Sequence, residues 1–458
     1  MRPSPSALRS FSRLSTFILC ILIFSTFSFA APPDRIAGPI ASGQLIKLSA
    51  GVPMRAQAQY DRGPVDPSLK LSYMTLLTVP SASQREALDQ LLAEQQNRNS
   101  PLYHKWLTPE QYADRFGLSP NDIQKLTTWL QSQGFSVHNV ARGQNWIVFS
   151  GTAAQAEKTF QTEIHNFDVD GTARFSNTTP ASIPAALSGV VTGIRGLSNF
   201  PAKSNLQRRK PSYTLPVTGG SVLYLAPGDI KTIYDIPSSM DGTGQTLAVM
   251  GETDVYLDDL NNFRSGFGFS TIPTTGAGSC ATDGSGLIIA PCTTTAAGAA
   301  FQYVLLGTDP GKPDTIQDDL IEADLDLEWT AATAPNAQII YVNAPDPTGN
   351  GVWDSWYYAV DNKVSPVITL SYGICELGEA LTPGGQGTIS PNEGTFSSDE
   401  AELIKANSFG ITFLNASGDS GAAGCDPNTA TVATGGLAVL SRQQPRSHWR
   451  RRDCDNHQ

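Results

Sequence analysis

Two patterns of apolar and polar positions follow one another along the chain. In the first, apolar segments of strand length alternate with helical periods. Residues 71–79 (LSYMTLLTV) predict a strand, and leucines three and four residues apart predict a helix from Ser81 or Ser83 to Gln96. Further predicted elements are a helix from Ser119-Pro120 that stops at Gly134, strands at 135–140, 146–149 and 162–167, and a helix at 153–160. This alternation indicates an α+β domain from about residue 45 to 200, with helices on one face of a sheet.

The second pattern starts near Tyr224 and consists of short, apolar, β-rich segments with helices between some of them. The predicted strands are Thr246–Met250, Gln338–Val342, Pro366–Leu370 and Ile411–Asn415, and the predicted helices lie at about 317–333 and 397–409. Strands of this buried type are typical of a parallel α/β sheet. Ligand sites of such sheets lie beyond the carboxyl ends of the strands.

The N-terminus has the layout of an export signal. Arg2, Arg9 and Arg13 precede an apolar run at residues 17–29, and Ser28-Phe29-Ala30 offers small residues for cleavage after Ala30. The alternative is a membrane anchor, but the run is shorter than the ~20 residues that a span needs. We therefore expect residues 1–30 to be a signal peptide and the protein to be secreted, with no membrane association after its removal.

Length and charge narrow the class of protein. A chain of 458 residues predicts two folded units. With 31 Lys+Arg against 42 Asp+Glu, the formal net charge is −11. Such a chain offers no basic face for phosphates, so nucleic acid is not an expected partner.

The two predicted domains are joined by a polar segment, residues 201–222. It carries Lys203, Arg208, Arg209 and Lys210 among Pro, Ser and Thr, without an apolar period. Exposed basic linkers are common cleavage sites, which predicts a processing site here. A solvated tether is an equally good interpretation.

An exported protein can form disulfides. Cys280 and Cys292 bracket a Gly/Ser/Thr-rich stretch and are placed to close a small loop. Cys375 and Cys425 each follow a predicted strand, so the two strand ends are candidates for a second pair. The spacings are not those of a zinc site. Cys454 is left over.

One predicted helix is dense in carboxylates. Glu322 and Asp326 are four residues apart, so a helix places them on one face, and Asp324 and Glu328 form a second pair on another face. The helical wheel does not decide which pair is buried. Two adjacent carboxyl groups in an apolar site share a proton readily, which suits a general base at acid pH. The alternative is a solvated acidic face.

Small residues follow two of the predicted strands. Ser371-Tyr372-Gly373 comes directly after one, and residues 417–421 (SGDSG) follow another. Small residues at a strand end allow a substrate backbone to approach closely. Asp419, if protonated, can donate a hydrogen bond to a developing oxyanion. Asp419 as a turn-forming residue in an ordinary loop is an equally good interpretation.

A chymotrypsin-like mechanism with Ser420 as the nucleophile is excluded. That mechanism needs a positioned histidine as base. The five histidines lie in the first predicted domain or near the C-terminus, namely His104, His138, His165, His448 and His457. None falls within the α/β segment that contains Ser420.

Several ordered motifs resemble the sedolisin family, the serine-carboxyl peptidases related to kumamolisin. Residues 100–117 (SPLYHKWLTPEQYADRFG) and 129–137 (WLQSQGFSV) are similar to the family's activation domain. Residues 322–326 (EADLD) match its Glu-x-x-x-Asp helix motif, and residues 417–421 match its oxyanion loop. The resemblance runs from about residue 45 to 440.

The resemblance implies a fold, a mechanism and partners. It implies an α+β ferredoxin-like prodomain at 45–200, which acts as an intramolecular partner, and an incomplete subtilisin-like α/β parallel-sheet catalytic domain at 223–440. In the family's mechanism a Ser hydroxyl attacks the scissile carbonyl of a protein or peptide substrate, and an acyl-enzyme forms. The resemblance assigns the base to Glu322, the residue that holds this base to Asp326, and oxyanion stabilisation to Asp419. Carboxyl groups can act as bases in acid, where an imidazole is protonated.

The sequence departs from the family in its last segment. The family's nucleophile lies in a Gly-Thr-Ser motif, and no Gly-Thr-Ser occurs in these 458 residues. The calcium site that the resemblance implies for intact members has no counterpart either. Residues 441–458 contain five Arg and two Asp and match nothing in the family, so we interpret them as an aberrant tail from a frameshift or premature stop; a basic segment that binds an acidic surface is the alternative.

These observations leave two hypotheses. The first is a secreted, acid-acting endopeptidase precursor that is inactive as written. The second is a non-catalytic remnant, or a prodomain-type inhibitor or folding partner of intact relatives.

Overall fold

The structure is a computed structural model, and the residues that it describes are 32–41, 43–48, 52–53, 56–169, 171–200, 203–204, 225–276, 278–307, 309, 312–313, 319–344, 351–373 and 395–416. The predicted signal peptide, Cys375, Cys425, Asp419 and the basic tail lie outside these ranges. The residues from Ala31 onward belong to one compact unit. Among the described residues, no helix combines the length and apolar character needed to cross a membrane.

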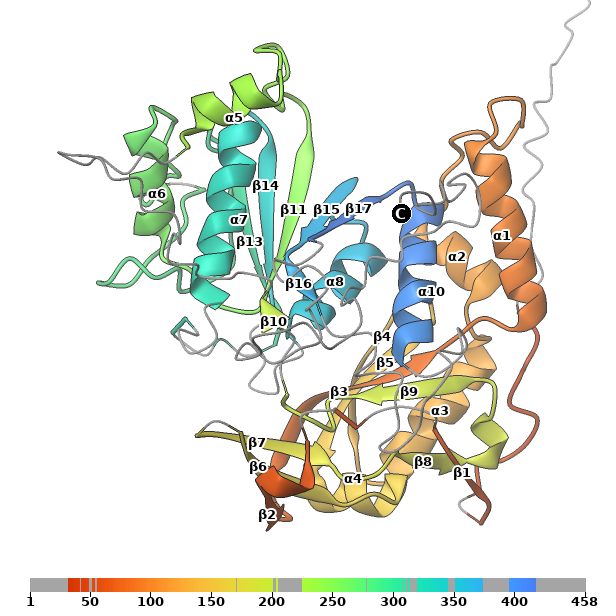
Figure 1. The fold of residues 1–458 in the computed structure, drawn as a ribbon. Coiled ribbons are helices and arrows are strands. Elements are labelled where there is room, and N and C mark those ends of the chain that lie inside the picture. The colour runs from red at the N-terminus through yellow and green to blue at the C-terminus, as the bar shows by residue number, and fades with distance from the viewer. Residues whose placement is uncertain are drawn as a thin grey trace, which may run out of the picture. The chain divides into compact units, whose positions relative to one another are not determined.

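The first part of the chain is built on a four-stranded antiparallel sheet (Figure 1). Its strands, in spatial order, are β4 (Ser136–Val140), β5 (Trp146–Thr152), β3 (Lys70–Thr78) and β9 (Val191–Arg195). Its helices are α1 (Ala82–Gln96), α2 (Pro109–Phe116) and α3 (Pro120–Ser132) between β3 and β4, and α4 (Ala153–Phe160) after β5. The predicted mixture of strands and helices is confirmed, although α2 was not predicted.

Smaller sheets and turns complete this part. A three-stranded sheet contains β2 (Asp61–Pro64), β6 (Ile164–Val169) and β7 (Thr172–Asn177), and a two-stranded one contains β1 (Leu45–Lys47) and β8 (Ser182–Pro184). The 3₁₀ turns are η1 (Ala58–Tyr60) and η2 (Ala185–Leu187).

Helix starts in this part follow from side-chain caps. Ser81 accepts a hydrogen bond from the backbone N–H of Gln84, and the Gln84 side chain accepts one from the Ser81 N–H, which forms a capping box. The Ser119 side chain caps α3 by accepting a hydrogen bond from the N–H of Asp122, and Pro120 occupies the first helical position. The sequence predicted both starts because these residue types satisfy N–H groups that a helix leaves open.

The second part is built on a six-stranded sheet in which five strands are parallel. In spatial order these are β12 (Cys292–Thr294), β13 (Phe301–Leu305), β14 (Gln338–Asn343), β11 (Thr246–Gly251), β15 (Val367–Leu370) and β17 (Thr412–Asn415). Only β12, at the edge, runs antiparallel to its neighbour. The four strands predicted from the sequence are all present, and their parallel pairing confirms the predicted α/β class.

Helices cover both faces of this sheet. They are α5 (Pro227–Ile233), α6 (Leu257–Gly266), α7 (Asp319–Thr333), α8 (Gly351–Asp361) and α10 (Thr395–Ser408). Helices α6 and α7 pack with Val249, on one face of β11, whereas α8 and α10 pack with Ala248 and Met250, on the other (Figure 1). The connections β13–α7–β14 and β14–α8–β15 therefore advance in the same direction across the sheet on opposite faces. One of the two is a left-handed crossover, an exception to the usual rule.

The disulfide predicted between Cys280 and Cys292 is present. It joins the start of β12 to the loop before it, and Cys280 is fully buried. The proposed second pair lies outside the described residues.

The largest hydrophobic cluster contains side chains from both parts of the chain. Tyr112 of α2 meets Phe409, which follows α10, with ring centroids 5.8 Å apart, and Trp146 of β5 meets Tyr357 of α8 at 6.3 Å. Each part also has a cluster of its own. Residues 56–200 and helices α8 and α10 thus share a core.

Candidate active site

Helix α7 carries a row of acidic side chains on one face. Asp319, Glu322 and Asp326 are three and four residues apart, which aligns them along the helix. Asp319 and Glu322 are buried, with exposures of 1% and 4%, and Asp326 is partly buried. The structure thereby resolves what the helical wheel left open, because the pair Glu322 and Asp326 contains the more deeply buried carboxyl group.

Asp326 lies beside the end of strand β15. The Ser371 hydroxyl, one residue after that strand, donates a hydrogen bond of 2.8 Å to Oδ1 of Asp326. Burial raises the pKa of Asp326, the negative charge of Glu322 raises it as well, and the Ser371 hydrogen bond lowers it, so that the resulting pKa is about 7. At acid pH Asp326 is therefore protonated and able to donate a hydrogen bond to a neighbouring carboxylate.

The next residue, Tyr372, connects the same strand end to the first turn of α7. Its hydroxyl donates to Oδ1 of Asp319 at 3.2 Å, and both side chains are 1% exposed. Burial and the charges of Asp319, Glu252 and Glu322 raise the pKa of Tyr372 well above its ordinary value, so this phenol stays neutral. Glu252, which follows β11, accepts a hydrogen bond from the N–H of Val352. The carboxyl ends of β11 and β15 thus converge on the acidic row of α7.

A short strand of the predicted linker lies beside this group. Strand β10 (Lys203–Ser204) pairs antiparallel with β16 (Tyr372–Gly373), with Ser204 opposite Tyr372. The sequence predicted a polar linker at 201–222, and these two of its residues form a strand. Strand β10 contains only two residues, so no alternation of apolar and polar positions could reveal it in the sequence. The backbone of residues 372 and 373, directly after Ser371, is thus paired with an extended segment of the same chain.

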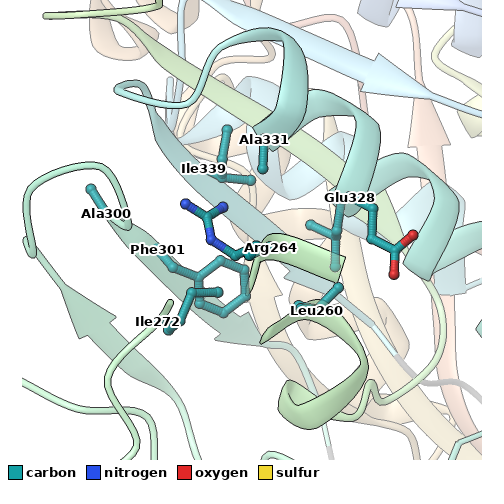
Figure 2. A pocket seen from close by; sticks show the side chains of 9 residues that line it. Leu260, Arg264, Ile272, Ala300, Phe301, Glu328, Ala331 and Ile339 are labelled. Atoms are coloured by element: carbon teal, nitrogen blue, oxygen red, sulfur yellow. The ribbon is translucent and has the colours of Figure 1, made fainter. Parts of the chain in front are cut away.

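The second carboxyl pair of α7, Asp324 and Glu328, points to a different neighbour. Both have pKa values raised to about 7 by burial and by the charge of Asp259 on α6. A small cavity between α6, α7 and the sheet is lined by Leu260, Arg264, Ile272, Ala300, Phe301, Leu327, Glu328, Ala331 and Ile339 (Figure 2). Figure 2 shows the guanidinium of Arg264 and the carboxylate of Glu328 pointing in different directions. This cavity lies on another face of α7 from Glu322, and we assign no chemistry to it.

A buried polar network that the sequence did not reveal lies at the ends of β11, β13 and β14. Tyr303 and Asn343 donate to Oδ1 of Asp254 at 2.8 and 3.0 Å. Burial and the carboxyl group of Asp309 raise the pKa of Asp254 to about 6, although the hydrogen bonds from Tyr303 and Asn343 oppose the change. The signal available in the sequence was the position of Asp254 just beyond a predicted strand.

The remaining predicted site residue, Asp419, lies outside the described residues. Strand β17 and Ala416, the last described residue, lead toward it, and β17 pairs with β15 in parallel. In the described part of the chain, no group of three or more His, Cys, Asp or Glu side chains is arranged to hold a metal ion. The calcium site that the resemblance implies for intact members stays a prediction, and no chemical step is assigned to calcium.

Comparisons with known proteins find similarity in both parts of the chain. A family model for the activation domain of pro-kumamolisin matches residues 57–200. Xanthomonalisin from Xanthomonas sp. (strain T-22) is 28% identical over 354 residues, which cover 73% of this chain and 38% of that protein. Sedolisin from Pseudomonas sp. (strain 101) is 24% identical, covering 74% and 52%, and human tripeptidyl-peptidase 1 is 27% identical, covering 79% and 58%.

Among solved structures, a chain of Pseudomonas sedolisin, a serine-carboxyl proteinase, complexed with two molecules of pseudo-iodotyrostatin, is similar to this chain. It shares 24% identity with a TM-score of 0.30 and covers 45% of this chain and 47% of that one.

Fold and comparisons together define the class of protein. An activation-type domain precedes a parallel α/β domain, and sequence similarity covers more of the chain than residues 57–200 alone. The resemblance to precursors of the sedolisin family is confirmed. The chain spans about half the length of the curated relatives that it matches.

Proposed function

We propose that this chain belongs to a precursor of a secreted, acid-acting serine-carboxyl endopeptidase, which hydrolyses peptide bonds through an acyl-enzyme. The observation that carries the proposal is the position of Asp326. It lies beside Glu322, accepts a hydrogen bond from Ser371, and is adjacent to a backbone strand that already pairs with an extended segment. Such a strand offers a protein or peptide substrate main-chain hydrogen bonds beside the acidic pair.

In this proposal Glu322 is the general base, and it accepts the proton of a serine hydroxyl as that hydroxyl attacks the scissile carbonyl. Asp326, protonated in acid, donates a hydrogen bond that keeps the Glu322 carboxylate oriented and ionised. Protonated Asp419 donates to the oxyanion that forms at the carbonyl oxygen. The proton held by Glu322 then passes to the leaving amine as the acyl-enzyme forms.

Residues 45–200 are proposed to act as an intramolecular prodomain with a ferredoxin-like arrangement. The strand order β4-β5-β3-β9 and the succession β-α-β-β-α-β support this assignment. Residues 201–222 then carry the processing site, and 223–440 form part of a subtilisin-like peptidase domain. The apolar N-terminal run supports export and an extracellular location.

A polypeptide of these 458 residues contains no Gly-Thr-Ser, so we expect it to have no peptidase activity by itself. The test begins with the gene, by translating the DNA from the codon for Gly435 onward in all three frames. We expect one frame to continue into a Gly-Thr-Ser motif. The protein from that frame should hydrolyse peptides in acid, and Glu322→Gln should reduce the rate by ~10²–10⁴-fold.

Glu328→Gln is the matched control, because it removes a carboxylate from another face of the same helix and should retain activity. Full activity of Glu322→Gln would contradict the role of this residue. Turnover by the 458-residue polypeptide would contradict the expectation that it is inactive.

The core shared by residues 56–200 with α8 and α10 supports a second candidate function, that of an inhibitor or folding partner of intact relatives. The 458-residue protein would then slow an active relative such as kumamolisin in a concentration-dependent way. If peptide hydrolysis by the relative is unaffected at a large excess of this protein, the second function is wrong.

A further inference from the structure

Helix α10 ends in a Schellman motif, in which a left-handed residue closes the last turn. Gly410 has a φ of +76°, its N–H donates to the carbonyl oxygen of Asn407 at 2.9 Å, and the N–H of Ile411 donates to that of Ala406 at 3.0 Å. These two hydrogen bonds satisfy two of the carbonyl groups that every helix leaves open at its C-terminal end. The carbonyl group of Ser408, the last residue of α10, takes no part in the motif.

Residues of the first part of the chain complete this helix end. The Ser408 carbonyl accepts hydrogen bonds from the N–H of Leu107 at 2.9 Å and from the side-chain amide of Gln95 at 3.2 Å. The neighbouring Trp106 ring lies against Gly410 so closely that a Cβ there would be 2.6 Å from it. The segment between α1 and α2 thus caps α10 and requires glycine at position 410.

The same segment contacts the end of α8, which is built in the same way. Lys363 is the left-handed residue, with a φ of +48°, and its N–H donates to the carbonyl oxygen of Val360 at 3.0 Å. The N–H of Val364 donates to that of Ala359 at 3.0 Å, which completes a second Schellman motif. The Lys363 ammonium then donates to the carbonyl oxygen of Leu107 at 3.3 Å.

The last residue of α8, Asp361, is held by a second segment of the first part. Its Oδ2 accepts from the N–H of Arg142 at 2.7 Å and its Oδ1 from the N–H of Gly143 at 2.9 Å, in the turn between β4 and β5. Successive N–H groups of this kind form a concave site for an anion. Asp361 is 2% exposed, and a negative charge at a helix C-terminus is unfavourable by itself. The two N–H groups and the Lys405 ammonium, 3.1 Å away, offset that effect.

We propose that Gln95 and residues 105–107 and 142–143 form a site for two helix ends, and that this helix-end site selects the domain with which residues 56–200 associate. The partner that it fits has two helices in contact that each end in a left-handed residue, as α8 and α10 do. One of them needs glycine opposite Trp106, and the other needs a carboxylate as its last residue. The proposal concerns this contact alone and does not depend on peptidase activity.

Buried polar groups make such a contact selective. A domain without a carboxylate at the position of Asp361 would leave the N–H groups of Arg142 and Gly143 buried without an acceptor, which is unfavourable. A domain with a larger residue at the position of Gly410 would collide with Trp106. Both effects act against a wrong partner rather than in favour of the right one, and specific interfaces use such effects.

A nicked protein tests this recognition. A specific protease site is inserted between residues 205 and 224 of the full chain, and the folded protein is cleaved there so that the two parts remain associated. The rate of separation after dilution is measured by the loss of energy transfer between one label on each part. Substitutions that weaken an interface act mainly on this rate.

Asp361→Asn keeps the size of the side chain but replaces one acceptor oxygen by an amide group that cannot accept from Arg142 or Gly143. We expect the two parts to separate roughly tenfold faster or more. Asp258→Asn, at an exposed position of α6, is the matched control and should leave the rate unchanged. Equal rates in Asp361→Asn and in the control would overturn the proposal.

Gly410→Ala places a methyl group against the Trp106 ring and should also accelerate separation. Backbone strain at position 410 is present in the joined and in the separated state, so it does not contribute to this rate. In a Trp106→Ala background the methyl group has room, and Gly410→Ala should then cause no further acceleration. The same acceleration by Gly410→Ala with and without the Trp106 ring would overturn the proposal.

Lys363→Met is a milder variant that decides the question if Asp361→Asn does not fold. It removes the ammonium group that donates to Leu107 and should increase the rate several-fold. Lys231→Met, in the last turn of α5, is its control and should have no effect. Equal rates in these two variants would count against the helix-end site in the same way.

Discussion

The hydroxyl of Ser371 donates a 2.8 Å hydrogen bond to Oδ1 of Asp326, across the boundary between the end of β15 and the middle of α7. This contact ties a residue of the parallel sheet to the acidic pair of the helix. The hydrogen bond also lowers the pKa of Asp326, because it stabilises the charged form of this carboxyl group. Burial has the opposite effect and favours the neutral form.

Removal of the Ser371 hydroxyl should therefore raise the pKa of Asp326 above about 7. We expect this shift for Ser371→Ala in a carboxyl-carbon NMR titration of the full chain. Ser365→Ala is a control at the other end of the same strand, since the Ser365 hydroxyl donates to the backbone oxygen of Thr246 instead. A pKa that is unchanged in Ser371→Ala would show that the hydrogen bond does not form in solution.

The guanidinium of Arg195 holds two buried carboxylates, so its loss should be strongly destabilising. Arg195→Met removes the cation that lies 2.9 Å from Asp399 and should lower the free energy of unfolding by ~3–5 kcal/mol at neutral pH. Arg62→Met removes a surface pair, 53% and 46% exposed, and should cost less than ~1 kcal/mol. Denaturant titration of both variants measures the difference, and similar losses would contradict the buried position of Arg195.

The charge of Asp259 should affect the stability of the protein in a pH-dependent way, because it acts on the second carboxyl pair of α7. The pKa values of Asp324 and Glu328 are raised to about 7, so the stability associated with their protonated forms is present in acid and lost as pH rises through that value. Asp259→Asn removes a repelling charge and should raise the thermal midpoint at about pH 8 but not at about pH 5. Asp258→Asn, its exposed neighbour, serves as the control, and an equal effect of the two at about pH 8 would refute the assignment.

Gly410 lies where the two parts of the chain meet. Its φ is +76°, and a Cβ there would approach the Trp106 ring to 2.6 Å. Gly410→Ala should therefore destabilise the protein more than Gly268→Ala, a position with φ of +77° and open space around it, where only the backbone strain of ~1–2 kcal/mol applies. Thermal unfolding of the two variants separates the steric effect from the strain, and equal midpoints would mean that Trp106 does not contact Gly410.

Much of the fold was readable from local signals. Ser81 and Ser119 mark helix starts because their side chains cap open N–H groups, and the β-rich runs that became β11 and β14 are buried on both faces. Helix α8 was missed because nearly every side chain in it is buried. A helix that is apolar on all sides lacks the amphipathic period on which the prediction depended.

The site was predictable only in part. The i, i+4 spacing of Glu322 and Asp326 is a local feature, and the structure places that pair beside Ser371. The contacts of Asp326 with Ser371, of Tyr372 with Asp319, and of Arg195 with Asp399 join residues 45 to 204 positions apart. Such contacts follow from the order of strands in the sheet and from the shared core, neither of which leaves a period in the sequence. The role of Asp419 stays a prediction.

The account depends most on the electrostatic coupling of Glu322 and Asp326, and the titration of Asp326 in Glu322→Gln tests it most directly. The negative charge of Glu322 contributes to the raised pKa of Asp326, so the substitution should lower that pKa from about 7, whereas Glu328→Gln should not change it. A titration of Asp326 that is the same in Glu322→Gln and in the unsubstituted protein would show that the two carboxyl groups do not act as a pair, and the proposed base would lose its support.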